Sequence, residues 1–146
     1  MAPTFEDCAV DIRLVHWSTK YSVKVSLLDD QHRVLFELIN ELHGAMLDGN
    51  GRQVAPSILK RLLDYTRTHF FDEEALMVRT NYHEFSDHRA AHEKLIEELR
   101  RLCGDFERGE KYLSTKLLGF LRHWLRSHIL DMDKRYAKHM NEAGVH

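Results

Sequence analysis

Apolar side chains recur at alternating intervals of three and four residues in four long stretches of the chain. This is the interval at which one face of an α-helix repeats. The predicted helices span about residues 28–47, 54–79, 83–107 and 112–132, and helices of ~20 residues are ~30 Å long. Because short connections join the four segments, the pattern predicts an all-α fold, an up-down-up-down four-helix bundle.

Turn-forming residues separate these segments. The run DGNGR, residues 48–52, ends the first helix, and Pro56 is expected in the first turn of the second, where its missing N–H costs nothing. The run TNY (80–82) closes the second helix, and RGE (108–110) breaks the pattern after the third. A short C-terminal tail, DKRYAKHM (133–140), is expected to add a helical turn or two.

The first 27 residues show no clear helical period. They contain Phe5, Val15 and Trp17, so we expect an extended N-terminal arm that packs against the bundle. Only YSVKV (21–25) has the alternation of a β-strand. The expected organisation is therefore a single domain, with an arm at 1–27 and a bundle at 28–146.

Composition excludes several classes of function. The chain has 146 residues, 43% of them hydrophobic, a formal net charge of −2 and no basic block, so neither nucleic acid nor a membrane surface is expected as a partner. No stretch approaches the ~18 apolar residues of a membrane span, and no signal-peptide pattern is visible. Cys8 and Cys103 lie far apart without a metal-binding spacing and are expected to be free thiols. A cytoplasmic location is the default expectation.

The eleven histidines are unusual, and five of them lie in otherwise apolar stripes. A glutamate lies in the same kind of position, one turn after a histidine in the segment HFFDEEALM (69–77). All four predicted helices contribute to this set, and their apolar faces converge on one interior. The six residues are His32, His69, Glu73, His88, His92 and His128.

A lone core histidine is usually satisfied by a hydrogen bond, but burying six unpaired polar groups would cost several kcal/mol each. A single domain has only about 5–15 kcal/mol of net stability, which makes a metal-free interaction bundle improbable. Imidazole with carboxylate suits iron, zinc, copper or nickel, and the absence of thiolate favours iron or manganese. Six ligands exceed one tetrahedral zinc site, so two metals sharing carboxylates are expected.

Other metal-site motifs are missing. The chain contains no Glu-x-x-His pair of ferritin-like di-iron proteins, no HExxH and no CxxCH. A bis-histidine haem would leave the remaining histidines and Glu73 unexplained. Asp72 and Glu74 are rivals of Glu73, although the spacing of four from His69 favours Glu73.

Four segments together resemble the hemerythrins, and specifically the single-domain bacterial members. They are LLDDQH (27–32), HFFDEEALM (69–77), HRAAH (88–92) and WLRSHILDMD (124–133). The resemblance covers roughly residues 17–136. It implies a non-haem di-iron centre with an oxo or hydroxo bridge, in which His88, His92 and His128 hold one iron and His32 and His69 the other. Glu73 and Asp133 would bridge the two irons.

Only the resemblance selects Asp133. This residue lies five positions after His128, about 140° away on a regular helix, and the neighbouring Asp131 is no better placed. The choice of Asp133 implies that the helix loosens or ends there. The resemblance also suggests an altered arm conformation at Lys24, where many bacterial members have glycine.

The resemblance implies reversible dioxygen binding at the iron with two histidines, as in an oxygen carrier, store or delivery protein rather than an enzyme. Dioxygen and a protein that receives it are the expected partners, and a monomer is expected. The alternatives are a module that senses oxygen, redox state or nitric oxide, and a di-iron oxidase or peroxidase that uses Tyr65. Five apolar candidates for the oxygen pocket are Leu125, Ile129, Phe70, Trp124 and Leu35.

Overall fold

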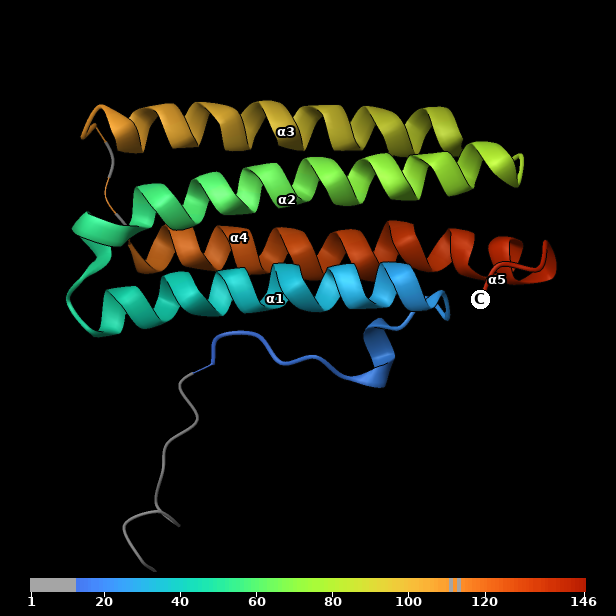
Figure 1. Cartoon of the computed structure of the whole chain (residues 1–146), viewed down its shortest axis with the longest axis horizontal. Coiled ribbons are helices and arrows are strands. Elements are labelled where there is room, and N and C mark those ends of the chain that lie inside the picture. Colours follow the sequence, from blue (N-terminus) through green and yellow to red (C-terminus); the bar gives the residue numbers. More distant parts are fainter. Residues whose placement is uncertain (1–12, 111, 113) are drawn as a thin grey trace, which may run out of the picture.

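Four long helices lie side by side and alternate in direction (Figure 1). The computed structural model describes residues 13–110, 112 and 114–146. The helices are α1 (Ser26–Leu47), α2 (Gly51–Arg79), α3 (Phe85–Glu107) and α4 (Thr115–His128). The predicted up-down-up-down bundle is confirmed, and YSVKV forms no strand. Within the described residues, no helix is long and apolar enough to cross a bilayer.

The starts of α2 and α4 each differ by three residues from the prediction. Helix α2 begins at Gly51, so Pro56 lies beyond the first turn. Proline has no N–H to donate to the backbone carbonyl four residues earlier, which here belongs to the exposed Arg52. Water can satisfy that carbonyl, which is why the proline is tolerated. Helix α4 begins at Thr115 because Ser114 caps it, its hydroxyl accepting a 3.1 Å hydrogen bond from the backbone N–H of Leu117.

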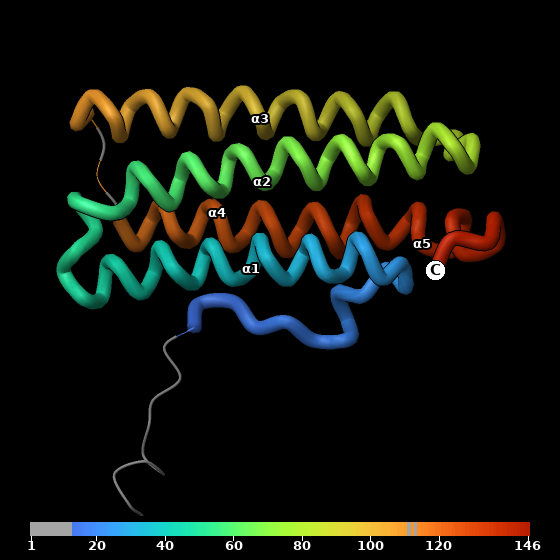
Figure 2. The backbone as a smooth tube through the Cα atoms, viewed as in Figure 1, coloured from blue at the N-terminus to red at the C-terminus, as the bar shows by residue number. Residues whose placement is uncertain are grey.

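The N-terminal arm runs along α1 (Figure 2). The backbone N–H of Val15 donates to Oδ1 of Asn40, and the Asn40 amide donates back to the Val15 carbonyl, both at 2.9 Å. Trp17 packs edge-on against Phe36, with ring centroids 5.6 Å apart. The expected packing of Val15 and Trp17 is confirmed, although Thr19–Tyr21 form a short 3-10 turn, η2. Phe5 and Cys8 lie outside the described residues, while Cys103 is a buried free thiol.

Lys24, the last exposed residue before α1, has a φ of 56°. This is the left-handed region that glycine adopts without steric cost. The altered conformation that the resemblance suggested is therefore not required, because the lysine itself takes a glycine-like φ. The carbonyl of Lys24 accepts a 2.9 Å hydrogen bond from the Asn141 side chain, which helps to hold this conformation.

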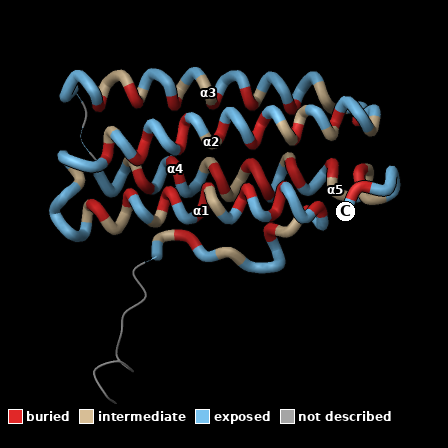
Figure 3. The backbone as a smooth tube through the Cα atoms, viewed as in Figure 1, coloured by how far each residue is buried: buried red, intermediate tan, exposed pale blue. Residues whose placement is uncertain are grey.

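Buried positions face the interior of the bundle (Figure 3). Their apolar side chains form two clusters. The larger cluster includes Leu35, Phe70 and Leu125, and the smaller includes Leu28 and Met77. Along α1, His32 falls between Leu28 and Leu35; along α2, Glu73 falls between Phe70 and Met77. The predicted polar residues therefore form a layer between the two clusters, where water is excluded from both sides.

The chain does not continue from α4 as a regular α-helix. Ile129–Asp133 form a π-helical turn, η3, and Lys134–Glu142 form α5. The backbone N–H of Lys134 donates to the carbonyl of Ile129, five residues earlier. The expectation that the helix loosens before Asp133 is confirmed, and the tail forms the nine-residue helix α5, slightly longer than the turn or two expected.

Candidate metal centre

The seven residues expected to bind metal lie together in the interior, and none is more than 7% exposed. Helix α1 provides His32, α2 provides His69 and Glu73, and α3 provides His88 and His92. Pairs spaced by four lie one turn apart on the same helix face. The last residue of α4 and the last residue of η3 complete the set, which is His32, His69, Glu73, His88, His92, His128 and Asp133.

The π turn explains how Asp133 reaches the cluster. In a regular α-helix, a residue five positions after His128 would lie about 140° away. A turn closed by i→i+5 hydrogen bonds contains more residues, so the fifth residue returns close to the same face. Asp133 is fully buried, whereas Asp131 is exposed and lies outside the cluster.

The ligand atoms form two overlapping groups, each with all its atoms within 4.8 Å of one another. We call the first the three-histidine group: His88, His92, His128, Glu73 and Asp133. The second, the two-histidine group, contains His32, His69, Glu73 and Asp133. Both groups therefore share the same two carboxylates.

Glu73 turns one oxygen toward each group. Its Oε1 lies 3.0 Å from Nε2 of His88 and 3.0 Å from Nε2 of His92. Its Oε2 lies 3.0 Å from Nε2 of His69 and 3.6 Å from Nε2 of His32. A single carboxylate is thus divided between the three-histidine and two-histidine groups.

Asp133 is divided in the same way. Its Oδ1 lies 3.0 Å from Nε2 of His88 and 3.1 Å from Nε2 of His128. Its Oδ2 lies 3.0 Å from Nε2 of His32. Each of the two carboxylates thus offers one oxygen to one group and its other oxygen to the second group. This is the donor arrangement expected of a site for two neighbouring cations.

Several of these buried atoms lack a hydrogen-bond partner. They include Nε2 of His32 and His88, Oε1 of Glu73 and both carboxylate oxygens of Asp133. In addition, Nε2 of His92 and Nε2 of His128 face each other at 3.2 Å. Unpartnered buried polar atoms are costly, and a cation between them would satisfy the whole set. Imidazole nitrogen and carboxylate oxygen are suitable ligands for iron.

Without metal, protons take the place of cations in this cluster. Burial alone would lower the pKa of His32 and His88, but the carboxylates of Asp133 and Glu73 that lie close to them outweigh burial and raise each pKa to about 9. Burial raises the pKa of Glu73, but the neighbouring His69, His32 and His88 outweigh this and hold it well below its usual range. The site thus favours positive charge next to ionised carboxylates.

Side chains behind the ligands fix their orientation, and periodicity did not reveal them. Nδ1 of His69 lies 2.7 Å from the amide oxygen of Gln31, whose amide nitrogen donates to Asp72 at 2.6 Å. Nδ1 of His92 lies 3.2 Å from Oε2 of Glu74. The two rivals of Glu73 therefore lie behind candidate ligands, Glu74 in contact with His92 and Asp72 behind His69 through Gln31. The signal for Gln31 was its position beside His32 in the sequence.

Tyr136 is a further residue that the sequence did not indicate. Its hydroxyl donates a 2.8 Å hydrogen bond to Oε2 of Glu73, and the side chain is fully buried. Burial raises the pKa of Tyr136 well above its usual value, so the phenol keeps the proton that it donates. Its spacing of three residues from Asp133 is a signal that could have found it.

The five candidates for the oxygen pocket lie beside the cluster of histidines and carboxylates. The Phe70 ring stacks on His92 with centroids 3.6 Å apart, and the Trp124 ring stacks on His128 at 5.3 Å. Leu35, Leu125 and Ile129 are buried in the same apolar cluster as Phe70. The aromatic pair thus touches ligands of the three-histidine group.

Comparisons with known proteins identify the family of this chain. Residues 23–139 match the family model of the hemerythrin HHE cation binding domain. A bacteriohemerythrin of Methylococcus capsulatus is 34% identical over 85% of this chain and 95% of its own length. A hemerythrin-like protein of Naegleria gruberi is 31% identical over 83% and 89%. A crystal structure of wild-type hemerythrin superposes with a TM-score of 0.81, at 34% identity and over 87% and 98% of the two chains.

The chain belongs to the hemerythrin family. Its fold and its histidine and carboxylate cluster support a domain that binds non-haem iron and, as in this family, dioxygen.

Proposed function

We propose that this chain binds dioxygen reversibly at a non-haem di-iron centre, as an oxygen carrier, store or delivery protein. The observation that carries the proposal is the division of Glu73 and Asp133 between the two histidine groups. One iron would be held by His88, His92 and His128 and the other by His32 and His69, with an oxo or hydroxo bridge between them. When bound, the ferrous pair supplies the two electrons that dioxygen takes up and later returns.

The two-histidine group is the side on which dioxygen would bind, because it offers one histidine fewer than its neighbour. Buried apolar residues next to ligands of both groups keep water out. Leu35 follows His32 by one turn of α1 and is 2% exposed, and Leu125 precedes His128 by one turn of α4 and is also 2% exposed. A dry, tightly packed pocket protects the bound molecule from protonation and release as a reduced product.

Hydrogen bonds hold the ligand rings in place before any metal binds. Gln31 fixes the ring of His69 from behind, and Tyr136 fixes Oε2 of Glu73, the oxygen that faces the two-histidine group. Because these partners are buried, the geometry of the open side is preorganised by the protein rather than by solvent.

The geometry supports binding over catalysis. An oxidase or peroxidase needs a proton donor beside the open side, and Tyr65 was the candidate from the sequence. Tyr65 packs at the partly exposed edge of the larger apolar cluster, while the hydroxyl in the site belongs to Tyr136 and is engaged by Glu73. Replacing Tyr65 with Phe should therefore leave the autoxidation rate unchanged, and a marked change would favour the enzyme.

An iron assay paired with an optical spectrum tests the proposal. The purified protein is reduced without oxygen, exposed to air and then deoxygenated. Two irons per chain and a visible charge-transfer band that appears and disappears with dioxygen are expected. Rapid irreversible oxidation would favour a sensor or oxidase instead, and absence of iron would refute the proposal.

A further inference from the structure

The two histidine groups differ in what lies behind their ligands. The carboxylate of Glu74 lies 3.2 Å from Nδ1 of His92, in the three-histidine group. The neutral amide oxygen of Gln31 lies 2.7 Å from Nδ1 of His69, in the two-histidine group. The groups share the carboxylates of Glu73 and Asp133, so the asymmetry lies in these outer partners and in the number of histidines.

Both histidines present the same nitrogen to the site. Nε2 of His92 and Nε2 of His69 each lie 3.0 Å from an oxygen of Glu73. When Nε2 of a neutral imidazole is a ligand, the proton is on Nδ1, which then donates to its outer partner. His92 would thus donate to a carboxylate and His69 to an amide.

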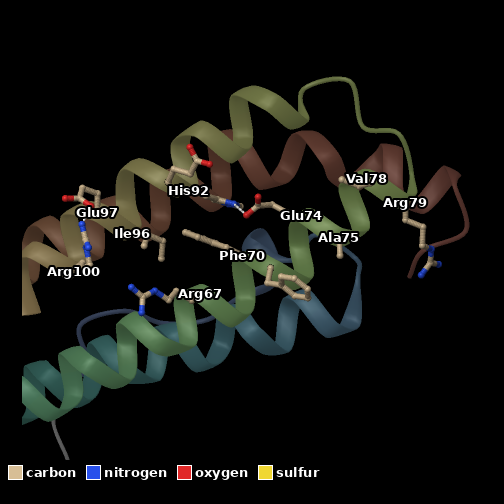
Figure 4. A pocket seen from close by; sticks show the side chains of 12 residues that line it. Arg67, Phe70, Glu74, Ala75, Val78, Arg79, His92, Ile96, Glu97 and Arg100 are labelled. Carbon is tan, nitrogen blue, oxygen red and sulfur yellow. Dashed lines mark hydrogen bonds and ion pairs between the residues drawn. The ribbon is translucent and has the colours of Figure 1, made fainter.

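Glu74 is partly exposed to solvent. It lines a groove of about 790 Å³ between α2 and α3, and its side chain is 24% exposed (Figure 4). Figure 4 shows its carboxylate turned toward the ring of His92, with Phe70 beside them. Gln31, in contrast, is only 6% exposed and donates to Asp72.

We propose that Glu74 is a positioning residue that strengthens metal binding in the three-histidine group, while Gln31 leaves the two-histidine group with a weaker ligand. A carboxylate that accepts the Nδ1 proton makes the imidazole a more basic ligand than an amide does, and loss of such a partner typically lowers metal affinity ~10- to 100-fold. The inference rests on the proposed di-iron function and extends it to unequal binding of the two metals.

The test is an anaerobic titration of the metal-free chain with ferrous iron in competition with a ferrous chelator. The variant E74Q keeps the size of the side chain and an oxygen that can accept a hydrogen bond, and it removes only the charge. We expect two binding events in the wild type, and in E74Q one event weakened ~10- to 100-fold with the other unchanged. E93Q is the matched control, because Glu93 is an exposed carboxylate of the same groove, beside His92 in sequence.

A double variant, Q31E/D72N, tests the other side. It exchanges the amide and the carboxylate of the Gln31–Asp72 pair, so that a carboxylate faces His69 without placing two negative charges together. We expect the weaker binding event to become tighter. Proton NMR of the chain loaded with cobaltous ion identifies the group involved, since the exchangeable Nδ1 proton of one ligand histidine should shift in E74Q and that of another in Q31E/D72N.

The outcomes separate this inference from the proposed function. If E74Q binds both metals with the affinities of the wild type, Glu74 is not a positioning residue. Equal weakening of both binding events would also overturn the proposal, because a merely structural role of Glu74 would produce it. A wild-type chain that binds fewer than two metals would instead refute the di-iron proposal. Failure of E93Q to match the wild type would show that surface charge, rather than the contact with His92, controls affinity.

Discussion

The hydroxyl of Tyr136 donates a 2.8 Å hydrogen bond to Oε2 of Glu73, in a region where both side chains are fully buried. Replacing Tyr136 with Phe keeps the ring and removes the donor. Because the acceptor is an ionised carboxylate, we expect the metal-free protein to lose about 1.5–3 kcal/mol of unfolding free energy. Urea unfolding measures this loss. Tyr82→Phe is the control: its hydroxyl bonds Glu84 at the same distance but near solvent, so its loss should be smaller.

Loss of a ligand histidine should remove iron and stability together, because metal binding and folding are coupled. We expect His69→Ala and His128→Ala to hold fewer than two irons per chain and to melt at a lower temperature than the iron-loaded wild type. Metal analysis gives the iron content per chain, and calorimetry gives the melting temperature. His123→Ala should retain both irons, since His123 is exposed on α4. Two irons in His69→Ala would show that the ligand assignment is wrong.

Leu125 and Leu118 lie on the same face of α4, each 2% exposed, but only Leu125 is one turn from His128. Either change to Ala should cost about 2–5 kcal/mol of stability, because each leaves a cavity in the core. Only Leu125→Ala should admit water near the iron and speed autoxidation, followed by the decay of the visible band. Equal autoxidation rates in the two variants would remove Leu125 from the pocket.

The metal-free protein should be most stable in mildly acidic solution. The pKa values of His32 and His88 are raised to about 9 from 6.5, so their contribution is complete below pH 6.5 and is lost as the pH rises through 9. The pKa of Glu73 is lowered from 4.5, so its contribution is complete above pH 4.5 and is lost at lower pH. The pKa of His69 is lowered from 6.5, chiefly by burial, so its contribution is complete above pH 6.5 and is lost at lower pH. Stability should therefore peak close to pH 6.5.

Urea unfolding across this range checks the pH prediction. The iron-loaded protein is the comparison, because metal-bound imidazoles must be deprotonated and their affinity for metal rises with pH. It should not lose stability between pH 6.5 and 9 as the metal-free chain does. A metal-free protein that gains stability over that interval would contradict the charge distribution of the cluster.

Lys24 has a φ of 56° and Asn81 a φ of 54°. A left-handed conformation costs a lysine about 1–2 kcal/mol, whereas asparagine tolerates it better. We expect Lys24→Gly to raise the unfolding free energy by about 1 kcal/mol after the greater chain entropy of glycine is included. Asn81→Gly should change it less. A loss of stability in Lys24→Gly would mean that the lysine side chain makes compensating contacts.

The four long helices and most of the candidate site followed from local pattern. Apolar residues at helical spacing identify α1 to α4, and polar residues in the same stripes identify six of the seven metal-binding candidates, His32 through His128. This works because pairs such as His69 and Glu73, or His88 and His92, lie one turn apart on one helix, so their common face is fixed by helix geometry alone. Asp133 escaped this reasoning because a π turn changes the spacing.

Only the tertiary structure decided what no single helix contains. The division of Glu73 and Asp133 between two histidine groups depends on how four helices pack. The contacts of Gln31 with His69 and of Tyr136 with Glu73 join residues 38 and 63 positions apart. Periodicity reports which face of a helix is buried, but the partner across the interface is set by packing. Local sequence thus determined six of the candidate ligands, and the assembled bundle decided how these side chains are paired and supported.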